Sequence, residues 1–223
     1  MSVIIHPFYF PKLFAKDPRL VWMPIGSYYD RLIGGEHNLV PASKRYIVCQ
    51  FIGSHKKGRG GHRAKFFAAF NPTATQKNPP TQQNLCQVNS TAGFTKGLQG
   101  NAYAHQLLDM SFALCPGGAS VETLRVYEAL ENGAIPVMVQ ADYDFGNFAF
   151  THPHNQFLVV PSWNETNAIL ASWQDPARRL DLDLLQRRNV QWYRRFKDAV
   201  ALHLRTFLMD RIFNTYIPLY ALQ

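Results

Sequence analysis

Short apolar runs alternate with longer segments of helical composition along most of the chain. The apolar runs are rich in β-branched and aromatic residues and cover 45–53, 85–88, 112–115, 135–137 and 157–160. The helical segments cover 64–70, 102–109, 122–132, 166–173 and 182–209. Apolar strands joined through helices are typical of a parallel sheet, because parallel neighbours need a crossover connection. The pattern therefore predicts an α/β fold.

The segment 112–138, FALCPGGASVETLRVYEALENGAIPVM, contains one complete unit of strand, loop, helix and strand. In such a unit the functional surface lies beyond the carboxyl end of the first strand, where the N–H groups of the helix start point outward. Gly117 and Gly118 allow a ligand to approach the backbone closely, and Ser120 is suited to cap the helix. This loop is therefore a candidate anion site.

Three polar residues, Glu122, Arg125 and Glu128, recur at every third position of that helix and form one polar stripe. A guanidinium group there can pair with a diphosphate, and a carboxylate one turn further along can accept the two hydroxyls of a ribose. The alternative is an exposed ladder of ion pairs, which many helices carry on their surface. Both interpretations fit the spacing.

A basic, glycine-rich loop follows the first long strand at 54–63. Its cationic and titratable side chains are Lys56, Lys57, Arg59, His62 and Arg63. The loop also lies at the carboxyl end of a strand, where Arg59, His62 and Arg63 would bind a phosphate group across the cleft. The alternative is a solvated surface loop. No aromatic residue interleaves these charges, as a platform for single-stranded nucleic acid would require.

A third polar stretch, at 140–155, follows the strand at 135–137 and is predicted to be irregular. Its polar residues and glycine are Asp142, Asp144, Gly146, Asn147, His152 and His154. Their spacing matches no standard set of metal ligands, so we expect no metal site there.

Composition limits the class of protein. The chain has 223 residues, of which 47% are hydrophobic, and this is enough for one substantial core. No apolar run approaches the roughly 18 residues of a membrane span, and residues 1–10 lack the pattern of a signal peptide, so a soluble chain is predicted. The formal charge of +8 predicts anionic partners, such as a nucleotide diphosphate, a phosphorylated glycan or nucleic acid.

The three cysteines, Cys49, Cys86 and Cys115, are widely spaced in the sequence. They form neither a zinc pattern nor an even disulfide framework. Cys49 and Cys115 lie in apolar runs, so we expect them to be buried thiols of the core.

Several motifs of the chain resemble one family of enzymes. L-C-P-x-G at 114–118, R-x-Y-E-A at 125–129 and G-x-I-P-V at 133–137 are similar to the donor-sugar half of the exostosin-type glycosyltransferases. The resemblance is closer to the C-terminal domain of the ribitol xylosyltransferases, because exostosins would have an arginine at Gly117 and a glycine at Ser120. RRNVQWYRRFK at 187–197 is similar to the closing helix of the same domain and extends the likeness from about residue 45 to 208.

The resemblance implies a glycosyltransferase of the GT-B type, of which this chain would hold the donor-binding half. That half is a Rossmann-like parallel sheet with helices on both faces, here at 45–223. Residues 1–44 would then be the entry segment from a missing acceptor half. The donor would be a UDP-sugar, with UDP-xylose the best single choice, and the acceptor a glycan or a ribitol phosphate. The family works in the Golgi lumen, and transferases of this architecture generally need no metal.

The resemblance also gives roles to the matched residues. Gly118 and Ser120 would place backbone groups near the diphosphate, Arg125 would pair with it, and Glu128 would hold the ribose. Glu122 would orient Arg125 or touch the sugar. The general base is not identified, and His62, His152 and His154 are candidates by location alone.

Two other classes of function fit the sequence. One is a non-catalytic nucleotide-sugar-binding module that needs a separate acceptor subunit. The other is a basic nucleic-acid-binding protein, which the charge permits.

Overall fold

A computed structural model describes residues 4–6, 16–17, 19–26, 39–54, 62–70, 85–91, 101–118, 120–145 and 157–216 of the chain. Its central element is a five-stranded sheet in which all neighbouring strands are parallel. The strands, in the order β4-β3-β5-β6-β7 across the sheet, are β4 (Cys86–Thr91), β3 (Ile47–Ser54), β5 (Met110–Leu114), β6 (Ile135–Val139) and β7 (Leu158–Val160). The predicted parallel α/β sheet is confirmed.

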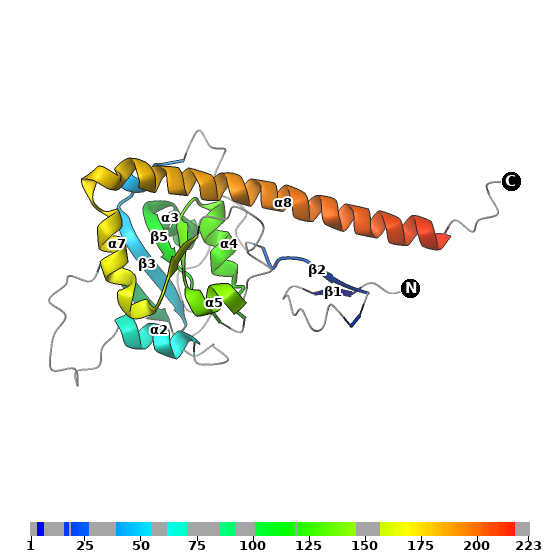
Figure 1. Cartoon of the computed structure of the whole chain (residues 1–223), viewed down its shortest axis with the longest axis horizontal. Helices are drawn as coiled ribbons and strands as arrows, with labels where there is room; N and C mark the ends of the chain where they lie inside the picture. The colour runs from blue at the N-terminus through cyan, green and yellow to red at the C-terminus, as the bar shows by residue number, and fades with distance from the viewer. Residues whose placement is uncertain are drawn as a thin grey trace.

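Helices cover both faces of this sheet (Figure 1). One core packs under α3 (Asn101–Asp109), α4 (Leu124–Glu131) and the middle of α8 (Arg179–Tyr216). The other packs under α2 (His62–Phe70), α7 (Thr166–Trp173) and the start of α8. Successive residues of β5 point to opposite cores, Phe112 and Leu114 to one and Ala113 to the other, and this is why the strand is apolar at every position but Ser111.

The last helix, α8, extends well past the sheet (Figure 1). Trp192 and Phe196 are buried against α4 and the sheet, so the predicted apolar stripe does form part of the core. Further along, Leu202 and Met209 are exposed. None of the described helices is both long and apolar enough to cross a lipid bilayer.

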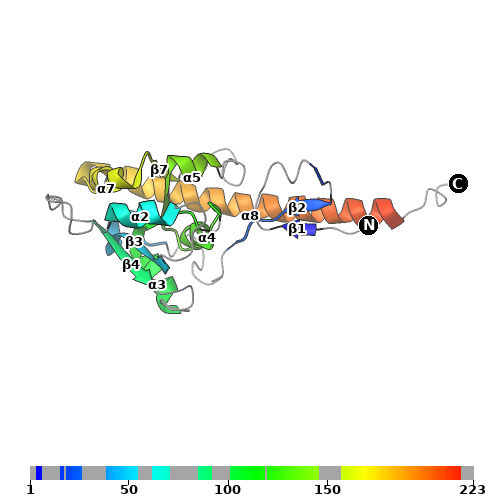
Figure 2. The same ribbon diagram turned by 90° about the horizontal axis from the view of Figure 1, so that it is seen from below.

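The chain enters the domain along α8. Just before β3, the short 3-10 helix η2 (Ala42–Lys44) is bonded to this helix, because the backbone N–H of Ala42 donates to Gln186 at 2.9 Å and that of Ser43 to Asp183 at 2.8 Å. Nearer the N-terminus, β1 (Ile4–His6) and β2 (Leu20–Trp22) form a separate two-stranded parallel sheet (Figure 2).

The irregular structure predicted after β6 is wrong for the first part of that stretch. Residues 140–145 form a short helix, α5 (Gln140–Phe145). Its buried Asp142 is held by tertiary contacts with His62 and the backbone of Gly117. Contacts with residues so far away in the sequence have no local pattern. The turn-forming residues of this stretch therefore wrongly indicated irregular structure.

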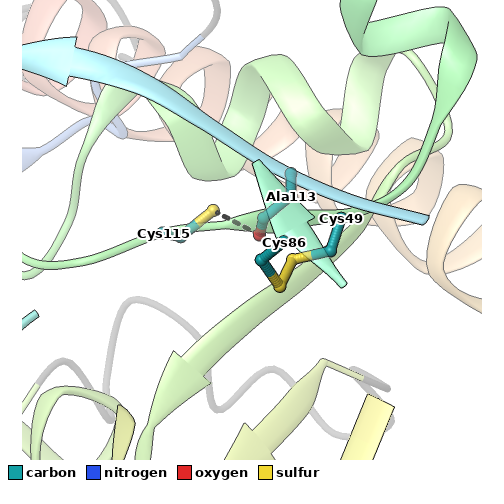
Figure 3. The surroundings of a disulfide bond; sticks show 4 residues. All are labelled: Cys49, Cys86, Ala113 and Cys115. Atoms are coloured by element: carbon teal, nitrogen blue, oxygen red, sulfur yellow. Dashed lines mark hydrogen bonds between the residues drawn. A yellow bond between two sulfur atoms is a disulfide. The ribbon is translucent and has the colours of Figure 1, made fainter. Parts of the chain in front are cut away.

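The prediction about the cysteines is wrong for one pair. Cys49 and Cys86 form a disulfide, and their Cα atoms lie 4.4 Å apart (Figure 3). The pairing register of β3 and β4 places these two residues opposite each other, although 37 positions separate them in the sequence. Cys115 is a free, buried thiol, as predicted.

Candidate functional site

The order of the strands identifies the boundary between β3 and β5 as a candidate ligand site. From β3 the chain passes through α2 to β4 on one side, whereas from β5 it passes through α4 to β6 on the other side. The direction of winding therefore reverses between β3 and β5. In open parallel sheets, ligands bind beyond the carboxyl ends of the strands at such a reversal. The loops after β3 and β5 are the ones that carry the predicted donor-binding residues.

The glycine loop after β5 is fixed by internal hydrogen bonds. The N–H of Gly117 donates to the Asp142 carboxylate at 3.0 Å, and the N–H of Gly118 donates to the carbonyl of Ser120 at 2.8 Å. In this structure both amides have partners within the chain. The side chains near the loop, more than its amides, are therefore the groups offered to a ligand.

Helix α4 begins later than predicted. Its first residue is Leu124, Thr123 holds the capping position, and the hydroxyl of Ser120 accepts a bond from the N–H of Glu122 at 3.3 Å. Ser120 is therefore a turn residue, and its predicted role as helix cap is wrong. Thr123 was not singled out in the sequence, yet its buried hydroxyl has no partner here, beside Gly118 at the start of the helix.

Arg125 is half-buried and lies across the end of β3. Its guanidinium donates to the carbonyl of Ile52 and lies 4.3 Å from the centre of the Phe51 ring. Gly53 makes room for it, because a Cβ atom on Gly53 would come within 2.9 Å of the Arg125 Nη2. The arginine is thus held in place by backbone and by an aromatic face.

Arg63 approaches the same place from α2. It donates to the carbonyls of Ser54 and Gly117, so it bridges the carboxyl ends of β3 and β5. Burial first, and then the charge of Arg125, lower the pKa of Arg63 to about 10. Two guanidinium groups from distant segments are therefore close enough to repel each other at the reversal point.

Glu122 is buried and faces the entry segment. Its Oε1 accepts from the Tyr127 hydroxyl at 2.5 Å and from the N–H of Ile25 at 3.3 Å. The carboxylate therefore links α4 to the residues that lead into the domain. The sequence predicted that Glu122 would orient Arg125 or touch the sugar, and the structure shows these two contacts for it.

Glu128 is also buried, one turn further along α4. Its Oε2 accepts from the hydroxyl of Tyr103 at 3.1 Å, and that tyrosine comes from α3. Burial raises the pKa of Glu128, and the nearby charge of Arg125 offsets part of the rise. Since Glu122 and Glu128 are both buried, the alternative of an exposed ion-pair ladder is excluded.

His62 opens α2 and pairs with Asp142 of α5. The distance from its Nδ1 to the Asp142 carboxylate is 2.6 Å. The sequence drew attention to Asp142 only as a possible metal ligand, and its pairing with His62 could not be foreseen. Within the described ranges no three His, Cys, Asp or Glu residues are arranged to hold a metal ion. Arg59, His152 and His154 lie outside the described residues.

Known proteins share parts of this sequence and fold. Residues 34–213 match the model of a family described as the RXYLT1 C-terminal domain. Ribitol-5-phosphate xylosyltransferase 1 of Homo sapiens is 28% identical over 120 residues, which cover 48% of this chain and 26% of the human protein. The protein of the same name in Mus musculus is 32% identical over 125 residues, which cover 50% of this chain and 27% of its own length.

The chain thus matches about a quarter of the length of these curated relatives. Among solved structures, the spinosyn forosaminyltransferase SpnP superposes with a TM-score of 0.33 at 12% identity. That superposition covers 82% of this chain and 50% of the other.

Proposed function

The chain belongs to the RXYLT1 C-terminal domain family, and from that premise we propose that it is the donor-binding half of a GT-B glycosyltransferase. The donor is a UDP-sugar. Because the relatives are named as xylosyltransferases acting on ribitol 5-phosphate, we propose xylose as the sugar and ribitol phosphate, or a glycan that carries it, as the acceptor.

The observation that carries the proposal is the meeting of Arg63 and Arg125 at the reversal point of the sheet. Each is half-buried and held by backbone carbonyls, and burial first, then the charge of Arg125, lower the pKa of Arg63. Glu128 lies close enough to Arg125 to offset part of its charge. Holding two like charges together in a partly dry place is unfavourable. A bound diphosphate would relieve that repulsion, so the pair is preorganised for a ligand with at least two negative charges.

In the reaction, the bond between the anomeric carbon and the outer phosphate oxygen breaks, and its electron pair stays with the nucleoside diphosphate. The acceptor hydroxyl attacks the same carbon and gives up its proton to a base. Arg63 and Arg125 would stabilise the charge that develops on the departing diphosphate. Gly118, Ser120 and the hydroxyl of Thr123 would line the approach to it.

Glu128 is proposed to bind the ribose. The hydroxyl of Tyr103 already donates to one oxygen of this carboxylate. The two hydroxyls of a ribose would hydrogen-bond to the same carboxylate. Because two arginines supply positive charge, we expect donor binding without a metal. Chelation with EDTA should then leave the affinity for UDP unchanged.

Titration calorimetry with UDP tests the proposal. Wild-type protein should bind UDP, and Arg125→Ala should lower the affinity roughly ten- to hundredfold, as expected for lost charge-assisted hydrogen bonds. Arg188→Ala makes the same change of charge on the exposed surface of α8 and is the matched control. UDP binding that is absent from the wild type, or equally strong in Arg125→Ala, would overturn the proposal.

Two alternatives are separated by the same measurements. A mixed oligonucleotide that binds with a steep salt dependence, while UDP does not, would identify a nucleic-acid-binding protein. UDP binding without turnover of UDP-xylose on a ribitol phosphate acceptor would identify a binding module. The short share of the relatives' length that the chain matches is the observation that keeps this second alternative open.

The disulfide supports a location in the secretory pathway. Disulfides such as Cys49–Cys86 form and persist in oxidising compartments. We propose the Golgi lumen, the compartment that the resemblance to the ribitol xylosyltransferases implies.

A further inference from the structure

One buried carboxylate controls two parts of the site at once. Asp142 has a side chain that is 1% exposed, and its two oxygens have different partners. Oδ1 lies 2.6 Å from the Nδ1 of His62, and Oδ2 accepts from the N–H of Gly117 at 3.0 Å. The carboxylate therefore joins the start of α2 to the glycine loop after β5.

The contacts around the imidazole fix its orientation. A Cβ atom on Gly117 would lie 3.2 Å from the Asp142 Oδ2 and 3.4 Å from the Cγ of His62, so the ring packs closely against the loop. Because a carboxylate only accepts hydrogen bonds, Nδ1 must carry a hydrogen. The side chain of His62 is 38% exposed. Since Nδ1 and Cγ face protein, we infer that the exposed part of the ring includes the edge that carries Nε2.

Cationic side chains pack against the same glycine loop as His62. Arg63 is the next residue along α2, it donates to the carbonyl of Gly117, and its Nη2 would be 3.2 Å from a Cβ atom on Gly118. The charge of Arg125 reaches Arg63 as well. The Nε2 edge of His62 is thus beside the place where the proposed function puts the diphosphate.

We propose that His62 and Asp142 form a phosphate dyad that recognises the outer, β-phosphate of the nucleoside diphosphate. Nδ1–H donates to Asp142 and Nε2–H donates to an oxygen of that phosphate. The ring therefore binds the phosphate as the imidazolium, with its second proton taken from solvent or from the phosphate. Asp142 is the positioning residue, because it sets the ring and the glycine loop together. In the reaction the dyad stabilises the leaving group, and the proton of the acceptor hydroxyl goes to a different base. This inference rests on the proposed function and adds a subsite to it.

The first test compares UDP with UMP, which lacks the β-phosphate. Calorimetry on His62→Ala should show a roughly tenfold loss of affinity for UDP and a change of less than about twofold for UMP. His62→Gln should restore part of the affinity for UDP, because its amide can place an N–H near the position of Nε2. Equal losses for UDP and UMP, or no loss for either, would overturn the dyad.

The second test separates this role from that of a general base. In Asp142→Asn, the amide oxygen can still accept from Gly117, and the amide NH₂ then donates to Nδ1 of His62. The ring is driven to the tautomer with hydrogen on Nε2. A ring that donates to phosphate keeps its function in this variant, so the UDP-to-UMP affinity ratio should stay within about threefold of wild type. A ring that acts as a base loses its lone pair, so a loss of turnover of about a thousandfold or more with intact UDP affinity would overturn the proposal.

Asp142→Ala completes the set. It should lower the UDP-to-UMP ratio as His62→Ala does, and in the His62→Ala background it should lower the ratio no further. An additive effect would contradict the dyad. Failure of the wild type to bind UDP would overturn the proposed function and this inference together, whereas an unchanged ratio in His62→Ala overturns the inference alone.

Discussion

The two ends of the sheet use buried arginines in opposite ways. At the amino end, Arg45 donates to four carbonyls, those of Val40, Leu107, Met110 and Asn132. At the carboxyl end, Arg63 donates to the carbonyls of Ser54 and Gly117, and Arg125 donates to that of Ile52 while Tyr103 and Glu128 lie beside it. An arginine that donates to many backbone carbonyls stabilises the fold. Two arginines whose positive charges repel each other favour the binding of an anionic ligand between them.

Gln186 shows the same difference at the amino end. Its amide donates to the carbonyls of Val40 and Gly133 and accepts from the N–H of Ala42, so both ends of the group are used. At the carboxyl end, the buried hydroxyl of Thr123 has no hydrogen-bond partner among the described residues, and neither has the buried Oδ1 of Asn132 at the amino end. Unpaired buried oxygens therefore occur at both ends, and the difference between the ends rests on the arginines and Gln186.

The largest expected effect is at the amino end. Arg45→Met should lower the free energy of unfolding by about 4–5 kcal/mol, because the three buried carbonyls of Leu107, Met110 and Asn132 each lose a bond from a charged donor, worth about 1.5 kcal/mol. The affinity of the folded protein for UDP should change by less than about twofold. Urea denaturation measures the free energy of unfolding, and titration calorimetry on the folded protein measures the UDP affinity. Arg188→Met on the surface of α8 is the control for both. A large loss of UDP affinity with little loss of stability would mean that the two ends are not distinct.

The disulfide gives the next largest effect. Cys49→Ala together with Cys86→Ala should lower the free energy of unfolding by about 2–4 kcal/mol, because the bridge closes a long loop in the unfolded chain. UDP affinity should again be nearly unchanged, since the bridge joins β3 to the edge strand β4 away from the reversal point. Cys115→Ala, which removes a thiol that forms no disulfide, is the matched variant, and a stability loss as large as that of the double variant would argue against the bridge.

A substitution at Gly53 should affect the carboxyl end alone. The added methyl of Gly53→Ala would come within 2.9 Å of the Arg125 Nη2, and the flexible side chain would move away. UDP affinity should fall roughly tenfold, as for one lost charge-assisted bond, with a smaller effect on stability. In the Arg125→Ala background the same substitution should change UDP affinity no further, and an additional loss there would show that Gly53 acts by another route.

The sequence predicted the architecture better than the contacts of the site. The alternation of apolar runs and helical segments was enough for the parallel sheet, because each strand and helix carries its own local pattern. It also placed Arg125 and Glu128 on one helix, since residues three apart share a face of a helix. The third member of the predicted stripe, Glu122, lies in the loop before α4, so the stripe was wrong for that residue. What a side chain contacts on another element has no such local pattern.

Three features illustrate the limit. The Cys49–Cys86 bridge depends on the register of β3 and β4, and the His62–Asp142 pair joins segments 80 residues apart. Glu122, predicted to orient Arg125 or touch the sugar, accepts a bond from the N–H of Ile25 across 97 positions of the chain. Each of these contacts depends on how the elements pack, and a spacing rule cannot supply that.

The smallest expected effect is at Glu128, where one substitution is expected to change both the stability of the fold and the affinity for UDP. Burial raises the pKa of Glu128 above its ordinary value of 4.5. The folded state therefore holds this proton at a pH where the unfolded state has lost it, and stability falls as the pH rises from about 4.5 through the raised pKa. Glu128→Gln has no such proton, and its amide oxygen can still accept from Tyr103. Its free energy of unfolding relative to wild type should rise over that pH window and then level off.

The same variant should bind UDP more weakly, because a neutral amide is a poorer acceptor for the ribose hydroxyls than a carboxylate. Glu131→Gln is the control on the same helix, where the carboxylate forms a surface ion pair with Lys197 at 2.8 Å that contributes little. Denaturation between pH 4 and 8 and UDP titration at pH 7 measure the two effects. If Glu128→Gln bound UDP as well as wild type does, the buried carboxylate would belong with Arg45 among the groups that serve the fold, and the ribose would need another partner.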